Sequence, residues 1–152
     1  MTRLEPLLAE HPFCRDLAPG QISRLAACAR ERQFAADEFL VREGEEIREF
    51  FLVRSGRVAL EIFTARRGPL LIQTREAGDF LGWLGLEPHA LWVVDARALE
   101  LTRVIVLPLE CLNQLLEEDP ILGYQLLKRF TQGLARHFAS MKRQVVNLLH
   151  GL

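Results

Sequence analysis

The apolar residues of this chain follow a helical period at its two ends and a strand-like pattern between them. In the first predicted helix the apolar positions are Leu4, Leu7, Leu8 and Phe13. Pro12 ends this helix, because proline lacks the amide proton that helical pairing needs. A second short helix begins near Pro19. Its inner stripe consists of Ile22, Leu25, Ala26 and Ala29. The pattern therefore predicts short N-terminal helices within residues 1–32.

From residue 33 to residue 108 the pattern changes to short runs rich in Phe, Val, Ile and Leu. The best strand candidates are Phe50 to Val53, Val58 to Phe63, Leu70 to Thr74, Trp92 to Leu99 and Val104 to Leu107. Turn signals separate these runs at Gly44, Gly56, Gly68-Pro69 and Gly78. Such regular punctuation predicts several short antiparallel strands in a sandwich or roll. The spacing alone does not distinguish a jelly roll from another small β-sandwich.

The helical period returns after Pro108 and continues through residues 109–152. A short helix over residues 109–117 has Leu112, Leu115 and Leu116 on its apolar side. The pair Asp119-Pro120 then starts a long helix that extends to about Leu149. Its apolar positions alternate steps of three and four residues at Tyr124, Leu127, Thr131, Leu134, Phe138, Met141, Val145 and Leu148. We refer to these positions as the heptad seam, and a seam of this kind predicts packing against another helix.

A second apolar stripe near the start of this helix, Leu126 and Phe130, is expected to lie on the strands. The helix would then dock at its start and project beyond, which leaves the heptad seam in need of a partner. A second copy in a parallel two-fold dimer is the simplest partner. The interface would contain Leu127, Thr131, Leu134, Phe138, Met141, Val145 and Leu148. The alternative is a helix that lies back along its own strands.

Length and charge narrow the class of protein. The 152 residues correspond to one domain, residues 1–152. The formal net charge of -1 shows no overall excess of positive charge, which binding to nucleic acid or to a membrane surface would favour. No charge-free apolar run reaches the roughly 18 residues of a membrane span, and no signal peptide is recognisable. We therefore expect a soluble cytoplasmic protein without a membrane partner.

The cysteines and histidines give no sign of a metal site. Cys14, Cys28 and Cys111 are far apart and form no CxxC pair, which argues against a disulfide framework or structural zinc. We expect buried free thiols in a reducing cytoplasm. The four histidines lie on separate predicted elements, and only His89 is near the glycine-rich stretch described next. Without a recognisable nucleophile or metal motif, the chain is not expected to be an enzyme.

The stretch from Gly78 to Leu99 reads GDFLGWLGLEPHALWVVDARAL and has the layout of a pocket. Gly82 and Gly85 lie close together within an apolar segment. Glycines in this arrangement let the backbone turn tightly and approach a ligand closely.

This stretch resembles the phosphate-binding cassette of cyclic-nucleotide-binding domains in the catabolite activator and fumarate-nitrate regulator family. The residues that carry the resemblance are Gly78-Asp79-Phe80-Leu81-Gly82 and Arg97-Ala98-Leu99. The segment from Leu134 to Leu148 also resembles the dimerisation helix of that family. The resemblance implies an α+β fold, in which short N-terminal helices precede an antiparallel β-roll (a double-stranded β-helix or jelly roll) and a long dimerisation helix follows it. In those regulators a helix-turn-helix comes next, whereas this chain stops at Leu152, so direct sequence-specific DNA binding of that kind is not expected.

The binding positions of the family pattern are occupied by different residues here. Where the family has a Glu that holds the ribose, this chain has Trp83. Where it has an Arg and a small residue that take the cyclic phosphate, this chain has Trp92 and Val93. By register, Met141 and Lys142 replace the hydroxyl pair that holds the purine. The resemblance therefore extends to the glycines and flanking residues of the cassette, but not to the residues that bind the cyclic nucleotide in the family.

Two interpretations of the pocket follow. Trp83 and Trp92 either fill it, or line it for a flat or apolar ligand. The candidate pocket residues are Phe80, Leu81, Gly82, Trp83, Trp92, Val93, Arg97, Met141 and Lys142. Basic residues available for a negative group on a ligand are Lys142, Arg97, Arg66 and Arg67. Arg97 and Asp95 lie two apart on one strand face and are also candidates for a salt bridge with each other.

We conclude from the sequence that the chain is a non-enzymatic regulatory sensor module, a homodimer that signals to a separate effector protein. Its ligand would be a small molecule, with a cyclic nucleotide as one possibility. Two alternatives remain open: a ligand-free interaction or scaffold dimer, and a cyclic-nucleotide binder that uses other contacts. A sensor differs from a scaffold in that its ligand has different affinities for two arrangements of the protein.

Overall fold

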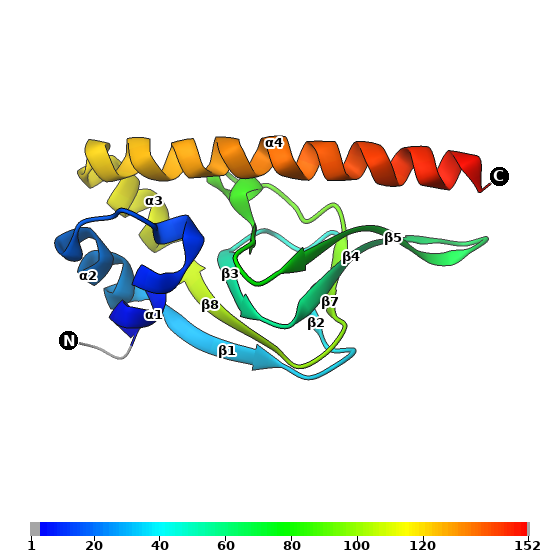
Figure 1. Cartoon of the computed structure of the whole chain (residues 1–152), viewed down its shortest axis with the longest axis horizontal. Helices are drawn as coiled ribbons and strands as arrows, with labels where there is room; N and C mark the ends of the chain where they lie inside the picture. The colour runs from blue at the N-terminus through cyan, green and yellow to red at the C-terminus, as the bar shows by residue number, and fades with distance from the viewer. Residues whose placement is uncertain (1–3, 152) are drawn as a thin grey trace.

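Two four-stranded antiparallel sheets form the centre of the molecule, with helices at one end and along one side (Figure 1). The computed structural model describes residues 4–151. One sheet has the order β1-β8-β3-β6, comprising Arg30–Phe34, Thr102–Pro108, Glu49–Ser55 and Phe80–Leu81. The other has the order β2-β7-β4-β5, comprising Phe39–Val41, Asp95–Ala98, Arg57–Thr64 and Gly68–Glu76. The chain changes sheet at nearly every connection, which is the topology of the β-roll implied by the sequence resemblance.

Short helices precede the roll and a long helix follows it (Figure 1). They are α1 Leu4–Glu10, η1 Pro12–Cys14, α2 Pro19–Cys28, α3 Leu109–Glu118 and α4 Pro120–His150, with one further turn, η2 Trp83–Leu86, between β6 and β7. The first predicted helix is divided, because Pro12 begins a new turn that His11 caps by accepting a hydrogen bond from the Phe13 amide at 3.1 Å. None of the described helices combines the length and apolar character that crossing a membrane requires.

Four of the five predicted runs are strands, and the fifth, from Trp92 to Leu99, is a strand only over β7. Trp92 lies outside β7 and exchanges hydrogen bonds with the backbone of the Gly44 to Glu45 turn, with N–O distances of 2.8 Å. The strands β2 and β6 contain three and two residues, too few to show an alternating pattern. β1 reads RERQF and is extended because it pairs with β8, not because of its own apolar content.

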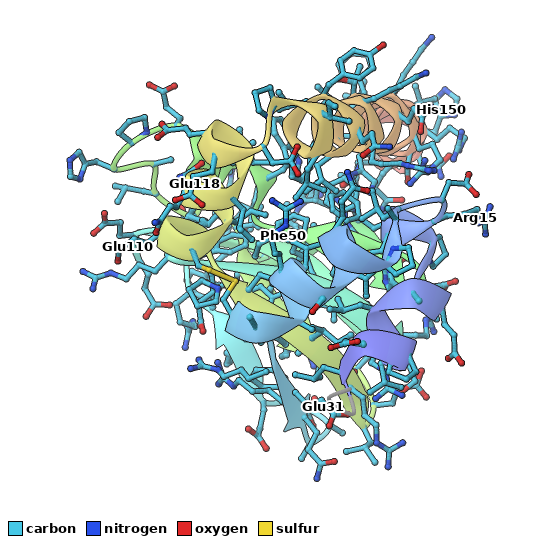
Figure 2. All side chains as sticks on the ribbon, turned by 90° about the vertical axis from the view of Figure 1, so that its left-hand side faces the viewer. Arg15, Glu31, Phe50, Glu110, Glu118 and His150 are labelled. Carbon is cyan, nitrogen blue, oxygen red and sulfur yellow. A yellow bond between two sulfur atoms is a disulfide. The ribbon has the colours of Figure 1, made fainter. Side chains whose placement is uncertain are left out.

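Four phenylalanines hold the N-terminal turn, the roll and the long helix together. Phe13 on η1, Phe50 on β3, Phe80 on β6 and Phe130 on α4 have ring centroids 5.0 to 5.8 Å apart. Figure 2 shows Phe50 in the interior of the molecule, where its side chain is fully buried. Burial of each such ring contributes about 1.5–3 kcal/mol. The predicted contact of the second stripe of α4 with the roll is therefore confirmed through Phe130.

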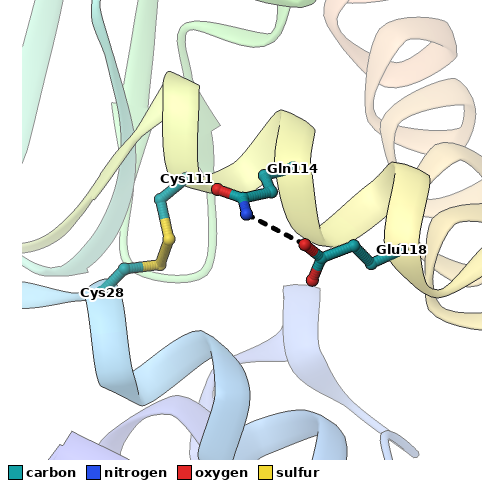
Figure 3. The surroundings of a disulfide bond; sticks show 4 residues. All are labelled: Cys28, Cys111, Gln114 and Glu118. Carbon is teal, nitrogen blue, oxygen red and sulfur yellow. Dashed lines mark hydrogen bonds between the residues drawn. A yellow bond between two sulfur atoms is a disulfide. The ribbon is translucent and has the colours of Figure 1, made fainter.

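The prediction of three free thiols is wrong for two of them. Cys28 at the end of α2 and Cys111 on α3 form a disulfide across a Cα–Cα distance of 6.5 Å (Figure 3). Their sequence separation of 83 residues contains no signal of pairing, and α2 and α3 meet only because both pack at the same end of the roll. Cys14 is a free buried thiol as expected, and burial raises its pKa to about 12.

Candidate ligand pocket

The glycine-rich stretch forms the wall of a pocket because its backbone comes unusually close to the roll. Gly82 precedes η2 with φ of +100°, a conformation that side-chain-bearing residues rarely adopt. A Cβ on Gly82 would lie 2.6 Å from the Glu49 carbonyl oxygen on β3. At Gly85 a Cβ would overlap Leu109 and Ile47. Gly82 therefore allows a close approach to β3, and Gly85 allows η2 to pack on Ile47 and on Leu109 of α3.

A cavity of about 170 Å³ lies between this stretch, strands β4 and β5, and helix α4. Most of its lining is apolar. The predicted pocket residues that line it are Phe80, Leu81, Gly82, Trp83, Trp92, Val93 and Met141. The structure therefore brings together residues from β6, from the loop after it and from the middle of α4.

Trp83 and Trp92 are walls of this cavity, and they do not fill it. Trp92 is 8% exposed and packs on Phe51 of β3, with ring centroids 6.4 Å apart. Trp83 is half-buried at the start of η2. Both indoles therefore line an apolar space that residues of α4 also line.

Arg97 and Lys142 lie outside the cavity lining. The Arg97 guanidinium donates to Glu61 on β4 at 2.9 and 3.1 Å and to Asp37 at 2.6 Å, and the hydrogen bond to Glu61 is the largest cause that raises its pKa. The possible pair with Asp95 is not formed. Asp95 accepts instead from the Glu43 amide at 2.8 Å, because the β2 side of its strand offers backbone donors. Exposed Lys142, Arg66 and Arg67 likewise make no part of the cavity wall.

Sequence reasoning missed a buried arginine in the cavity. Arg75 on β5 is 7% exposed and lines it, yet its Nε has no hydrogen-bond partner. Its Nη1 donates only to the Thr74 carbonyl, at 3.4 Å. Burial lowers the pKa of Arg75 to about 10, with the Asp79 carboxylate acting in the opposite direction. Strict alternation along β5 would have found it, since Gln73 and Arg75 share the inward face.

A buried histidine lies beside this arginine. His137 on α4 is 8% exposed, lines the cavity, and has no partner at either ring nitrogen. Its ring centroid lies 5.2 Å from that of Phe80. Burial, and then the charge of Arg75, lower the pKa of His137 to about 4, so the ring is neutral near pH 7. The expectation that His89 was the histidine near the pocket is wrong, because its 91% exposed side chain lies against Glu46 on the surface.

The heptad seam faces outward from α4. Large seam residues are exposed: Tyr124 68%, Leu127 49%, Leu134 41%, Phe138 68%, Met141 41% and Val145 47%. Thr131 is also exposed, and Leu148 is half-buried. The opposite stripe, which includes Leu126 and Phe130, is buried on the roll.

The helix does not project away from the roll as predicted. α4 runs along the whole length of the roll (Figure 1), and Gln144 near its end donates to the Leu71 carbonyl on β5 at 3.1 Å. The helix thus lies back along its own strands, as in the alternative prediction, but the heptad seam remains uncovered.

No group of His, Cys, Asp and Glu side chains that could hold a metal ion occurs within residues 4–151. The polar lining of the cavity consists instead of Gln73, Arg75 and His137. Gln73 is engaged, since its Nε2 donates to the His137 carbonyl. The cavity therefore has mostly apolar walls, with unpartnered nitrogen atoms on Arg75 and His137.

Comparison with known proteins identifies a matching family model and several solved structures with a similar fold. A family model described as cyclic nucleotide-binding domain matches residues 31–119. No curated protein resembles the chain closely enough in sequence to count as a match.

Several solved structures share the fold at low sequence identity. A cyclic nucleotide-binding domain from Methylobacillus flagellatus is 20% identical, with a TM-score of 0.83 over 95% of this chain and 85% of that one. A c-di-GMP-responsive global regulator from Xanthomonas campestris is 20% identical, with a TM-score of 0.75 over 87% of this chain and 65% of that one. The regulatory subunit of a cAMP-independent protein kinase A from Trypanosoma brucei is 20% identical, with a TM-score of 0.71 over 86% and 46% of the two chains.

Proposed function

This chain belongs to the cyclic nucleotide-binding domain family, and from that premise we propose that it is a non-enzymatic sensor that binds a small ligand other than cyclic AMP or GMP. Ligand occupancy is passed through a homodimer to a separate effector protein.

The observation that carries the proposal is that the cavity and the exposed seam share residues. Leu134, Phe138 and Met141 line the cavity, and the same three residues belong to the heptad seam. A ligand that repacks these side chains changes the surface on which a second α4 would pack. Differential affinity of a ligand for two arrangements is what a sensor requires.

We propose that cyclic AMP and GMP do not bind, because the residues that bind them in the family pattern are replaced here. A buried cyclic phosphate needs a paired cation, most effectively an arginine fork. Trp92 occupies the place of that arginine in the family pattern, and Trp83 occupies that of the ribose-binding glutamate. The fold is compatible with other ligands, since one similar structure is of a protein described as cAMP-independent and another of one described as c-di-GMP-responsive.

Titration calorimetry with cyclic AMP and cyclic GMP tests this part. We expect no heat of binding and no thermal stabilisation at millimolar nucleotide. Micromolar binding would contradict the proposal and would favour the alternative of a nucleotide binder with other contacts, for which Arg75 would be the first residue to mutate.

The proposed dimer is supported by the exposed seam. A continuous row of large apolar side chains on one helix face is what a coiled-coil partner covers. Because dimers of this kind are isologous, seam residues would meet their own copies or near neighbours across the two-fold axis.

Sedimentation of matched variants tests the dimer. Leu127→Glu places a charge on the seam without touching the cavity, and Leu101→Glu makes the same change outside α4 at nearly equal exposure, 49% against 47%. We expect the wild type and Leu101→Glu to sediment as dimers and Leu127→Glu as a monomer. A monomeric wild type, or a dimer that survives Leu127→Glu, would refute the seam interface.

A scaffold dimer that binds no ligand is the competing function. It is favoured by the burial of Trp92, which is 8% exposed as a structural core residue would be. A ligand that changes the dimer dissociation constant would exclude it.

A further inference from the structure

The cavity contains two buried polar groups whose hydrogen-bonding capacity is unused. Nε of Arg75 and both ring nitrogens of His137 are buried without a partner. Buried donors in folded proteins are nearly always satisfied, because leaving one unpaired costs about 1–3 kcal/mol. Both residues line the same cavity, one from β5 and one from α4. Their unused donors therefore mark a place where a ligand acceptor completes the structure.

Arg75 and Arg136 place two positive charges in this region, and the Asp79 carboxylate is the nearby negative charge. Within the described residues, Arg75 forms no ion pair with a carboxylate, whereas Arg97 and Arg42 do. Asp79 acts on Arg75 through space, but its carboxylate accepts a hydrogen bond from the Glu76 amide at 2.9 Å. Arg136 on α4 adds a second positive charge that disfavours the protonated forms of both Arg75 and His137. Burying a guanidinium that forms no direct ion pair is costly, and an anion bound beside it would offset that cost.

The size of the cavity limits the rest of the ligand. A cavity of roughly 150 Å³ holds a single benzene ring, and the cavity here is about 170 Å³. The lining also includes the indoles of Trp83 and Trp92 and the ring of Phe138. Flat aromatic walls of this kind favour a flat apolar body.

We propose that the pocket takes a small carboxylate with a single-ring or similarly compact apolar body, and that Arg75 binds the carboxylate. The proposal rests on the proposed function, because it assigns the chemical class of the sensed ligand. The guanidinium donates to the carboxylate oxygens, and the neutral His137 ring donates one further hydrogen bond. The apolar body lies between the two indoles and α4.

A pair of probes that differ only in charge tests the assignment. 4-Fluorobenzoate and 4-fluorobenzamide have nearly the same shape, and both can be followed by ¹⁹F NMR. Quenching of tryptophan fluorescence gives an independent measurement, because the chain has two tryptophans and both line the cavity. In the wild type we expect the carboxylate to bind at least about tenfold more tightly than the amide.

Two arginine variants test which positive charge causes the preference for the carboxylate probe. Arg75→Gln should weaken 4-fluorobenzoate binding by at least about tenfold and leave 4-fluorobenzamide unchanged. Arg136→Gln is the matched control, since Arg136 carries the same charge nearby but does not line the cavity. In Arg136→Gln, the ratio of the affinities for 4-fluorobenzoate and 4-fluorobenzamide should stay within about twofold of the wild-type ratio.

Equal affinity for the two probes in the wild type, a preference that survives Arg75→Gln, or no binding of either probe at 10 mM would each overturn the inference. These failures are distinct from failure of the proposed function, which sedimentation of Leu127→Glu and titration with cyclic nucleotides decide independently. Stability of the ligand-free protein gives a further check. Arg75→Gln should raise the melting temperature if Arg75 is held for a ligand, and a lower melting temperature would assign it a structural role instead.

Discussion

Gly82 illustrates how a single residue determines the shape of the pocket. Its positive φ and its contact with β3 are separate requirements, and both exclude a side chain. Gly44 shares only the first of them, because it has φ of +91° but open space where a Cβ would lie.

We predict that Gly82→Ala lowers the free energy of unfolding by about 2 to 4 kcal/mol, the sum of backbone strain and a clash with the Glu49 carbonyl. Gly44→Ala is the control and should cost about 1 to 2 kcal/mol, since only backbone strain applies there. Urea unfolding of both variants measures the difference. Equal losses would mean that β6 and β3 separate easily, and that the close approach does not hold the wall in place.

His137 makes the stability of the protein depend on pH. Its pKa is lowered to about 4 in the folded protein, against 6.5 in an unfolded chain. Between these values the unfolded state binds more protons, so stability falls as the pH falls from about 6.5 towards 4. Charged groups that face the ring from neighbouring elements are Arg75, Asp79 and Arg136.

We predict that His137→Gln removes part of this acid sensitivity. The loss of stability between pH 7 and pH 4 should be smaller than in the wild type by about 1 to 3 kcal/mol. His11, whose pKa is also lowered by burial, contributes equally to both proteins and leaves a residual slope. Urea unfolding across this pH range is the measurement, and identical slopes for the two proteins would show that His137 is not desolvated.

At the scale of elements, α4 has one buried and one exposed apolar face. Phe130 and Leu126 fix one face on the roll, while the heptad seam leaves the other uncovered. Between these faces, His137 and Phe138 follow each other in sequence, so a cavity donor and an exposed seam residue are adjacent on one helix. A rotation of α4 would move both sets of residues at once.

The disulfide ties two other elements, α2 and α3, at the end of the roll away from the β4–β5 hairpin (Figures 1 and 3). We predict that Cys111→Ser lowers the free energy of unfolding by about 2–4 kcal/mol under oxidising conditions, because the bond closes a long loop in the unfolded chain. Reductant should bring the wild type to the stability of the variant.

Alkylation in denaturant provides the control for this prediction. One thiol, that of Cys14, should react before reduction, and three should react after it. Three reactive thiols before reduction would mean that Cys28 and Cys111 are unpaired in solution.

For the whole molecule, the residues shared by cavity and seam predict that ligand binding and the proposed dimerisation affect each other. If a ligand changes the dimer dissociation constant by some factor, dimerisation changes the ligand affinity by the same factor. We predict a coupling of at least about fivefold, the lower end of common allosteric coupling.

The comparison is between 4-fluorobenzoate affinities of the wild type dimer and of Leu127→Glu, whose substituted residue does not touch the cavity. Sedimentation of the wild type with and without the probe should give the same factor. Equal affinities, with no change in the dimer constant, would leave a ligand-binding dimer without sensor behaviour.

Features that depend on local periodicity were available from the sequence. The helical period around Leu126 and Phe130 predicted which face of α4 is buried, and the long apolar runs predicted β3, β4, β5 and β8. These patterns are reliable because the backbone geometry of a helix or strand fixes which side chains share a face. The resemblance in the glycine-rich stretch added the topology of the roll, which spacing alone did not provide.

Features that depend on the meeting of distant segments were decided only by the tertiary structure. The bond between Cys28 and Cys111, and the choice of Glu61 over Asp95 as the partner of Arg97, follow from how the roll closes. Arg75 could be placed on an inward face by alternation, but the lack of a partner at its Nε depends on what β6 and α4 bring to that face. Local sequence sets the direction of a side chain, whereas its partners are set by the packing of elements far apart in the chain.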